Sequence, residues 1–111
     1  MQRIIKAFFY SLAGFKAAFK SEPAFRQELF LCAILLPTAI TLDVSITHKI
    51  LLIGSLFLVL ISELMNTAIE TIVDYISLDQ HPKAKIAKDV GSSIVLLALL
   101  NSAMVWAFIL F

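Results

Sequence analysis

Apolar residues fall into three long runs along the chain, over residues 24–42, 50–73 and 90–111. Each run is close to the length of about 20 residues that a helix needs to cross the hydrocarbon core of a bilayer. Short polar segments, residues 43–49 and 74–89, separate them. The pattern predicts three transmembrane helices joined by polar loops.

A fourth helix, with an apolar and a basic side, is predicted over residues 3–20. Its apolar residues recur at helical spacing and are Ile4, Ile5, Phe8, Leu12, Phe15 and Phe19. Its polar residues fall toward the other side and are Arg3, Lys6, Tyr10, Lys16 and Lys20. Such a helix lies on a membrane surface with its cations near anionic headgroups. Alternatively, Arg3 and Tyr10 can meet a bound anion or nucleotide.

Composition agrees with a membrane protein. The 111 residues are 60% hydrophobic and 15% charged, with a mean hydropathy of +0.95, far more apolar than a soluble domain. A net charge of +1 argues against nucleic acid as a partner. Cys32 is the only cysteine, so no intrachain disulfide is possible. The N-terminus lacks the pattern of a cleaved signal peptide, and one small bundle accounts for the whole length.

Basic residues are distributed unequally between the two sides of the predicted membrane segment. Of nine Lys and Arg residues, five lie at or before Arg26, three lie between residues 74 and 89, and only Lys49 falls on the opposite side. The positive-inside rule therefore places the N-terminus in the cytoplasm, and three spans place the C-terminus outside.

One polar stripe interrupts the second apolar run. At about 100° per residue its four members lie within an arc of roughly 80° on one side of a helix; they are Glu63, Asn66, Glu70 and Asp74. A carboxylate at mid-membrane costs roughly 2.5–3.5 kcal/mol on insertion scales, so these groups need a reason to be there. They are either structural, being protonated or paired with cations, or ligands of Mg²⁺ with a general base among them. Four polar groups in one stripe favour the second interpretation.

Two further polar segments are predicted on the cytoplasmic side. Glu22 precedes the first span and either joins the carboxylate set or pairs with Arg26 at i,i+4 spacing. Lys88 and Asp89 are expected at the start of the third helix, where helix N-termini and lysines attract phosphate, although a charged helix start is as often structural. Carboxylates, a lysine and a general base together favour phosphoryl transfer.

Deeper in the third span, Asn101 and Ser102 are the strongly polar residues. Groups of this kind inside a membrane helix commonly form hydrogen bonds to a neighbouring helix. We therefore expect interhelical hydrogen bonds from both.

Three segments carry a family resemblance: FRQE, ELMNTAIETIVD and HPKAKIAKDVGSS. Together they resemble the small prokaryotic diacylglycerol kinase family over nearly the whole chain. The resemblance implies an all-α homotrimer in the bacterial inner membrane, with sites made by more than one subunit. It also implies transfer of the ATP γ-phosphoryl group to the hydroxyl of diacylglycerol, with Mg²⁺ as cofactor.

The same resemblance implies residue roles. Glu63 would be the catalytic base with Asn66 supporting it, and Glu22 and Glu70 would bind the metal. The residues implied for ATP are Arg3, Tyr10, Glu22, Glu70, Asp79, Gln80, His81, Lys88 and Asp89. The residues implied for the lipid are Ala24, Phe25, Arg26, Gln27, Glu28, Glu63 and Ser92. Neither a Walker A glycine loop nor a protein-kinase catalytic loop occurs, so ATP must be held by an unrelated arrangement.

Three alternatives remain open at this point. The segment HPKAKIAKD resembles related undecaprenol kinases as much as diacylglycerol kinases, whereas FRQE favours the latter. A small proton-coupled transporter would also use intramembrane glutamates, although it would not need Lys88 and Asp89 beside them. A structural membrane subunit would show small-residue packing faces and no metal-ligand set.

Overall fold

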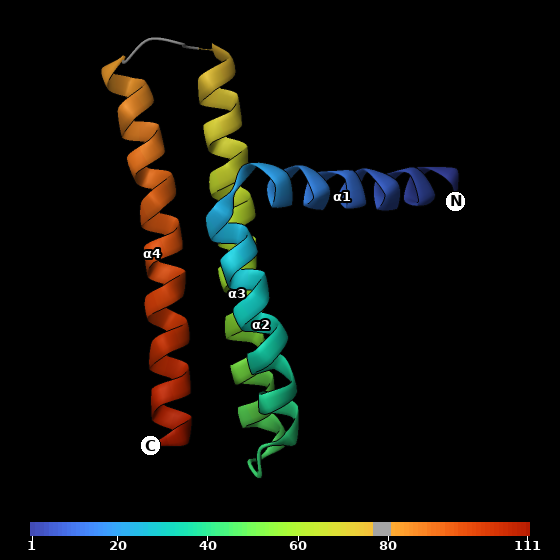
Figure 1. The fold of residues 1–111 in the computed structure, drawn as a ribbon, viewed down its shortest axis with the longest axis vertical. Helices are drawn as coiled ribbons and strands as arrows, with labels where there is room; N and C mark the ends of the chain where they lie inside the picture. Colours follow the sequence, from blue (N-terminus) through green and yellow to red (C-terminus); the bar gives the residue numbers. More distant parts are fainter. Residues whose placement is uncertain (77–80) are drawn as a thin grey trace.

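The computed structural model describes residues 1–76 and 81–111, and within these ranges the regular secondary structure is entirely helical. Its four helices are α1 (Gln2–Ser21), α2 (Pro23–Thr41), α3 (Ile46–Ile76) and α4 (Pro82–Leu110). The last three are long and apolar enough to cross a membrane. They run alongside one another, while α1 projects sideways from the top of α2 (Figure 1). The predicted all-α, multi-pass membrane class is confirmed.

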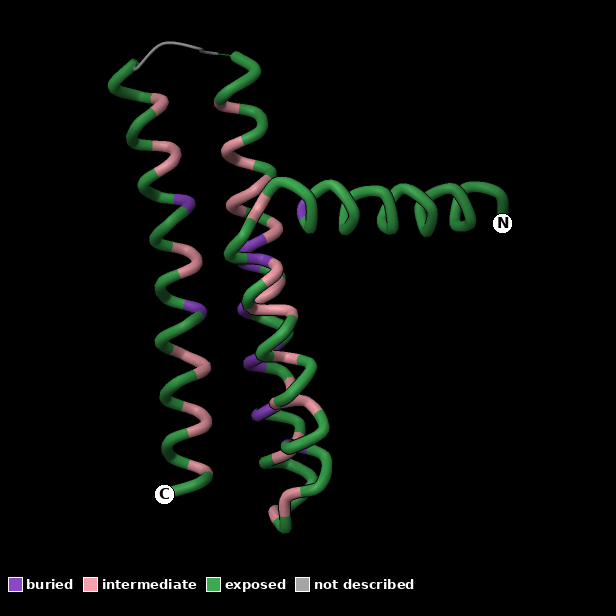
Figure 2. Tube along the Cα trace, viewed as in Figure 1, coloured by how far each residue is buried: buried purple, intermediate pink, exposed green. Residues whose placement is uncertain are grey.

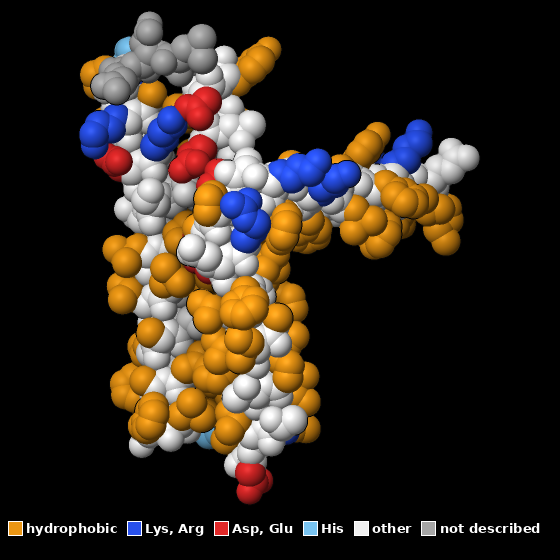
Figure 3. All heavy atoms as spheres, in the orientation of Figure 1, with side chains coloured by type: hydrophobic (Ala, Val, Ile, Leu, Met, Phe, Trp, Pro, Cys, Tyr) orange, Lys and Arg blue, Asp and Glu red, His pale blue; other side chains and the backbone are white. Residues whose placement is uncertain are grey.

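The first helix has the two-sided character expected of a surface helix. Every residue of α1 is exposed except Ala18. In the space-filling view its lysines and arginines follow one edge, and its hydrophobic side chains follow the edge that faces the level of the spans (Figure 3). This arrangement lets α1 rest on a bilayer with its apolar side down and its cations at the headgroups.

A single residue separates α1 from α2. Glu22 has an extended backbone, with φ −120° and ψ 104°, and Pro23 opens α2. The Arg26 guanidinium donates to the carbonyl oxygens of Phe19, at 2.6 Å, and Lys20, at 3.2 Å. These carbonyls are left free by the end of α1. Arg26 therefore fastens the bend, and the i,i+4 ion pair with Glu22 is absent from the described part of the chain.

The central helix of the bundle is α3, which packs against α4 along its length and against α2. Few side chains are fully buried, and they gather where these helices meet (Figure 2). The buried apolar residues are Ala18, Phe25, Ala39, Leu52, Leu56, Val59 and Ala98. Most other large apolar side chains face outward, where lipid tails or further protein copies can cover them.

Many hydroxyl groups are satisfied within their own helix. Each donates to a backbone carbonyl three or four residues earlier, and they are Ser11, Thr38, Thr41, Ser55, Ser62, Thr67, Thr71 and Ser93. Ser102 of α4 also meets Ser55 of α3 at 3.1 Å, which confirms the interhelical bond predicted for Ser102. Asn101 lines a groove between α3 and α4 instead.

The prediction of one polar loop from residue 74 to residue 89 is wrong. α3 continues to Ile76, and α4 already begins at Pro82. Nδ1 of His81 accepts from the backbone N–H of Lys83 at 3.1 Å, so His81 caps α4 and Pro82 occupies its first position. The lysine-rich segment is therefore the first turns of the helix.

Both α3 and α4 are longer than a membrane span, because α3 ends later and α4 begins earlier than predicted. At 1.5 Å per residue, α3 is about 46 Å long and α4 about 44 Å, against a hydrocarbon core of about 30 Å. Their connected ends project past the level of α1 (Figure 1). With α1 on the membrane surface, these ends form a helical pair that stands out into the headgroup and water layer.

Candidate active site

The polar stripe of α3 changes steadily in exposure along the helix. Glu63 is buried at 5% exposure, Asn66 and Glu70 are half-buried, and Asp74 is exposed. The stripe thus runs from the bundle interior to the projecting end of α3. It provides polar groups at several depths across the membrane boundary.

A carboxylate from outside the stripe, that of Glu22, reaches it from the bend between α1 and α2. Burial raises the pKa of Glu22, and the neighbouring carboxylates of Glu70 and Glu63 raise it further. Glu22 and Glu70, from two separate elements, therefore lie close together. A cation between them would remove the repulsion between their ionised forms.

The donors at this point fit Mg²⁺. This ion is commonly held by one or two protein carboxylates, with waters and substrate phosphates completing its octahedral shell. No group of three or more His, Cys, Asp or Glu side chains arranged for a metal is found in residues 1–76 and 81–111. Two carboxylates without a closed protein cage are the arrangement expected when phosphate oxygens supply the remaining ligands.

Asn66 links the stripe to α4. Its Nδ2 donates to Oε1 of Glu70 at 3.3 Å. Its Oδ1 is buried, has no hydrogen-bond partner among the described residues, and lies against the backbone of Gly91. One amide therefore contacts both a proposed metal ligand and the neighbouring helix.

Glu28 of α2 is the neighbour of Glu63, a pairing that the sequence did not predict. Its Oε2 is buried and lacks a hydrogen-bond partner within the described part of the chain. The two carboxyl groups approach closely enough for a hydrogen bond between them. A shared proton lets two such groups lie together. Glu28 therefore lies with the carboxyl groups of the candidate site.

Lys88 and Asp89 lie on the projecting pair of helices. They are within the second turn of α4 and not at its N-terminus, so the prediction that the third helix starts at these residues is wrong. Their contact with an anion stays a prediction. Lys88 pairs with Asp74, one turn beyond Glu70, and Asp89 pairs with Lys85 at 2.7 Å. Lys88 is half-exposed and the other three side chains are exposed, so these ion pairs contribute little to stability. The two lysines can therefore exchange their carboxylate partners for a phosphate at little cost.

The remaining candidates are scattered. Of the lipid set, Phe25 is in the core and Arg26 fastens the bend, while Ala24, Gln27 and Ser92 are exposed. Asp79 and Gln80 lie outside the described residues. Arg3 and Tyr10 lie on α1, about 28 Å and 18 Å from Glu22 along the helix axis. A single chain therefore does not bring these two to the carboxylates.

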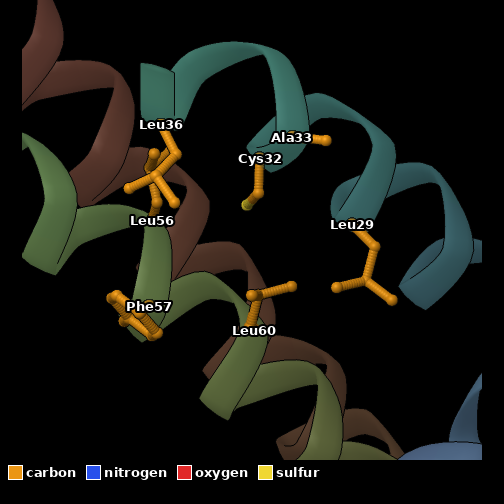
Figure 4. A pocket seen from close by; sticks show the side chains of 7 residues that line it. All are labelled: Leu29, Cys32, Ala33, Leu36, Leu56, Phe57 and Leu60. Carbon is orange, nitrogen blue, oxygen red and sulfur yellow. The ribbon is translucent and has the colours of Figure 1, made fainter. Parts of the chain in front are cut away.

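An apolar groove of about 280 Å³ lies between α2 and α3, and its lining side chains converge from both helices (Figure 4). It is lined by Leu29, Cys32, Ala33, Leu36, Leu56, Phe57 and Leu60. Leu29 directly follows Glu28, and Leu60 is one turn before Glu63. The groove therefore adjoins the Glu28–Glu63 pair on the membrane side.

Comparisons with known proteins agree with this arrangement. The family model described as prokaryotic diacylglycerol kinase matches residues 9–110. A diacylglycerol kinase of Pseudomonas aeruginosa is 49% identical over 110 residues, which is 99% of this chain and 89% of that protein. Diacylglycerol kinases of Haemophilus influenzae and Escherichia coli are 44% and 43% identical, over 100% and 97% of this chain and 94% and 88% of theirs.

Proposed function

Because the chain belongs to the prokaryotic diacylglycerol kinase family, we propose that it transfers the γ-phosphoryl group of ATP to the free hydroxyl of diacylglycerol, giving phosphatidic acid. The observation that carries the proposal is two pairs of neighbouring carboxyl groups from α2, α3 and the α1–α2 bend: Glu22 with Glu70, and Glu28 with Glu63. They lie beside an apolar groove and below the half-exposed Lys88.

The proposed roles of these carboxyl groups differ with their depth in the membrane. Glu63 is about 10 Å further from the projecting end of α3 than Glu70 is, at 1.5 Å per residue. A lipid hydroxyl can approach Glu63 while its acyl chain stays in hydrocarbon, along the groove that begins at Leu60. The nucleotide remains on the watery side with Glu70 and Lys88.

In the proposed reaction Glu63 acts as the general base. It accepts the proton of the lipid hydroxyl while the hydroxyl oxygen forms a bond to the γ-phosphorus. The bond from the γ-phosphorus to the bridging oxygen breaks, and ADP leaves. Glu28, next to Glu63, is placed to share the proton that Glu63 receives.

Glu22 and Glu70 are proposed to hold Mg²⁺ together with the ATP phosphates. When bound, the ion supplies charge neutralisation at the β- and γ-phosphate oxygens. Asn66 keeps the Glu70 carboxylate oriented through its 3.3 Å hydrogen bond. Lys88 is the nearby cation for the phosphates, and Asp89 and His81 lie toward the remainder of the nucleotide.

We also propose a homotrimer in which sites are shared between chains. Many apolar side chains of the three spans are exposed in the single chain, including Leu97 at 68%. Arg3 and Tyr10, remote from the carboxylates of their own chain, would reach the site of a neighbour. The mass of the purified protein by native mass spectrometry tests this assembly, and a stable monomer would contradict it.

The activity is tested by mixing purified protein with Mg²⁺-ATP and either diacylglycerol or undecaprenol in mixed micelles. We expect phosphorylated lipid with diacylglycerol and little with undecaprenol, and no product without Mg²⁺. Preference for undecaprenol would reassign the acceptor. If neither lipid is phosphorylated and ATP is not consumed, the kinase proposal fails and a transporter or structural role becomes the better explanation.

The basic residues support insertion into the bacterial inner membrane with the N-terminus and the α3–α4 connection in the cytoplasm. Lys83, in the first turn of α4, is exposed and suits a labelling test. With Cys32 replaced by Ser, a Lys83→Cys variant is expected to resist an impermeant thiol reagent in intact cells and to react after lysis. Labelling in intact cells would contradict the orientation.

A further inference from the structure

Gly91 differs from the other two glycines of the chain. A Cβ atom at position 91 would overlap Oδ1 of Asn66 on α3 and lie 3.3 Å from its Cγ. At Gly14 and Gly54 the same Cβ would meet nothing within 4 Å. The space that a side chain at position 91 would occupy is therefore filled by the amide of Asn66.

The orientation of that amide follows from hydrogen-bond chemistry. The Nδ2 of Asn66 donates to Oε1 of Glu70 at 3.3 Å, and only the NH₂ end of the amide can donate. The amide oxygen then necessarily points the other way, toward α4. It is buried there with no partner among the described residues, in the space that the absent Cβ of Gly91 leaves.

We infer that Gly91 is a positioning residue: its missing side chain admits the amide of Asn66 in the one orientation that directs the Glu70 carboxylate toward the proposed Mg²⁺ site. A larger residue at position 91 would displace the amide of Asn66. The end of the Asn66 side chain can rotate, whereas the backbone of α4 cannot move aside. Glu70 would then lose its donor and its fixed orientation.

Two general explanations for a helical glycine do not account for this contact. Glycine is a poorer helix former than alanine, so local helix stability does not favour it within α4. Close packing of α3 on α4 does not require a glycine at position 91 either. Apart from the atoms of Asn66, the nearest atom to a Cβ at this position is Cδ1 of Ile69, 3.6 Å away. That is an ordinary contact distance.

The test is a double-mutant cycle of Gly91→Ala and Asn66→Ala, measured in two ways. One is the rise in thermal unfolding temperature caused by Mg²⁺ in detergent, without ATP or lipid; the other is the Mg²⁺ concentration for half-maximal kinase activity. Gly91→Ala should reduce the thermal rise, increase the Mg²⁺ requirement and lower kcat by about 10- to 10²-fold. The double variant should be no worse than Asn66→Ala alone, because the clash is gone.

Gly14→Ala and Gly54→Ala are the matched controls and should behave as the wild type. A Gly91→Ala variant with normal Mg²⁺ dependence, or a double variant whose losses are the sum of the single ones, would overturn the inference. So would a wild-type protein whose unfolding does not respond to Mg²⁺. If Gly91→Ala folds only when combined with Asn66→Ala, the clash is confirmed. If neither folds, Gly91 is a packing residue and the inference is wrong.

The inference rests on the proposed function only where it names Glu70 as a Mg²⁺ ligand. A wild-type protein without kinase activity would refute the proposed function. The double-mutant cycle measured by thermal unfolding with Mg²⁺ would still test the role of Gly91. Conversely, an active kinase with an additive cycle would refute the role of Gly91 alone.

Discussion

Replacing Glu63 with Gln is expected to lower kcat by about 10²–10⁴-fold, the usual contribution of a positioned general base. Glutamine keeps the size of the side chain and can still form a hydrogen bond to Glu28, but it cannot accept the proton of the lipid hydroxyl. Mg²⁺-ATP binding and assembly should change little, because Glu63 is buried well below the nucleotide side. Steady-state kinetics with saturating lipid, together with ATP binding by the purified variant, provide the measurement.

Ser62→Ala is the matched control for this experiment. Ser62 precedes Glu63 on α3, is equally buried, and donates only to the carbonyl of Val59 in its own helix, at 2.6 Å. Its removal disturbs the same region without touching a carboxylate, so kcat should stay near the wild-type value. Near-normal kcat in Glu63→Gln, or loss of ATP binding in step with activity, would show that Glu63 is not the base.

The second large effect is expected on metal dependence. Glu22→Gln and Glu70→Gln should each raise the Mg²⁺ concentration for half-maximal activity by at least about tenfold, since even outer-shell changes at metal sites cost 10–100-fold in affinity. The reason is the loss of one of two neighbouring carboxylates, which are the proposed protein ligands of the ion. The measurement is a Mg²⁺ titration at fixed total ATP.

Asp43→Asn controls for the loss of a negative charge as such. Asp43 is exposed at the opposite end of the bundle, in the connection between α2 and α3. Its Mg²⁺ titration should superimpose on that of the wild type. An unchanged Mg²⁺ requirement in both Glu22→Gln and Glu70→Gln would remove these residues from the metal site and leave their proximity as a structural feature.

The sequence allowed the membrane class, the three spans and the stripe on α3 to be predicted, because each depends on periodicity along one helix. Pro82 also indicates the beginning of α4, because proline is common at the first position of a helix. The lysines after it favour a loop by composition, which is why the predicted loop extends to residue 89. Their place on a helix explains why Lys88 reaches Asp74 and not a phosphate site at a helix end.

The interhelical bond of Ser102 was predicted, but which residues meet each other between helices could not be predicted from the sequence. Glu28 follows Glu22 by six residues and shows no spacing that points to Glu63, because their contact depends on how α2 crosses α3. Gly91 likewise resembles any isolated glycine in a helix until the amide of Asn66 is seen beside it. Crossing geometry, rather than local propensity, decides both pairings.

The hydroxyl groups that bond within their own helices bear on how the chain enters the bilayer. A helix whose serines and threonines already donate to its own carbonyls presents no unsatisfied hydroxyl to lipid. The threonine hydroxyl groups of α2 and of the later half of α3 therefore need no neighbouring helix as a hydrogen-bond partner. Glu28 and Glu63 have no such partner within their own helices, and only docking of α2 on α3 provides one. The carboxyl groups of the candidate site are therefore the ones that gain most when α2 docks on α3.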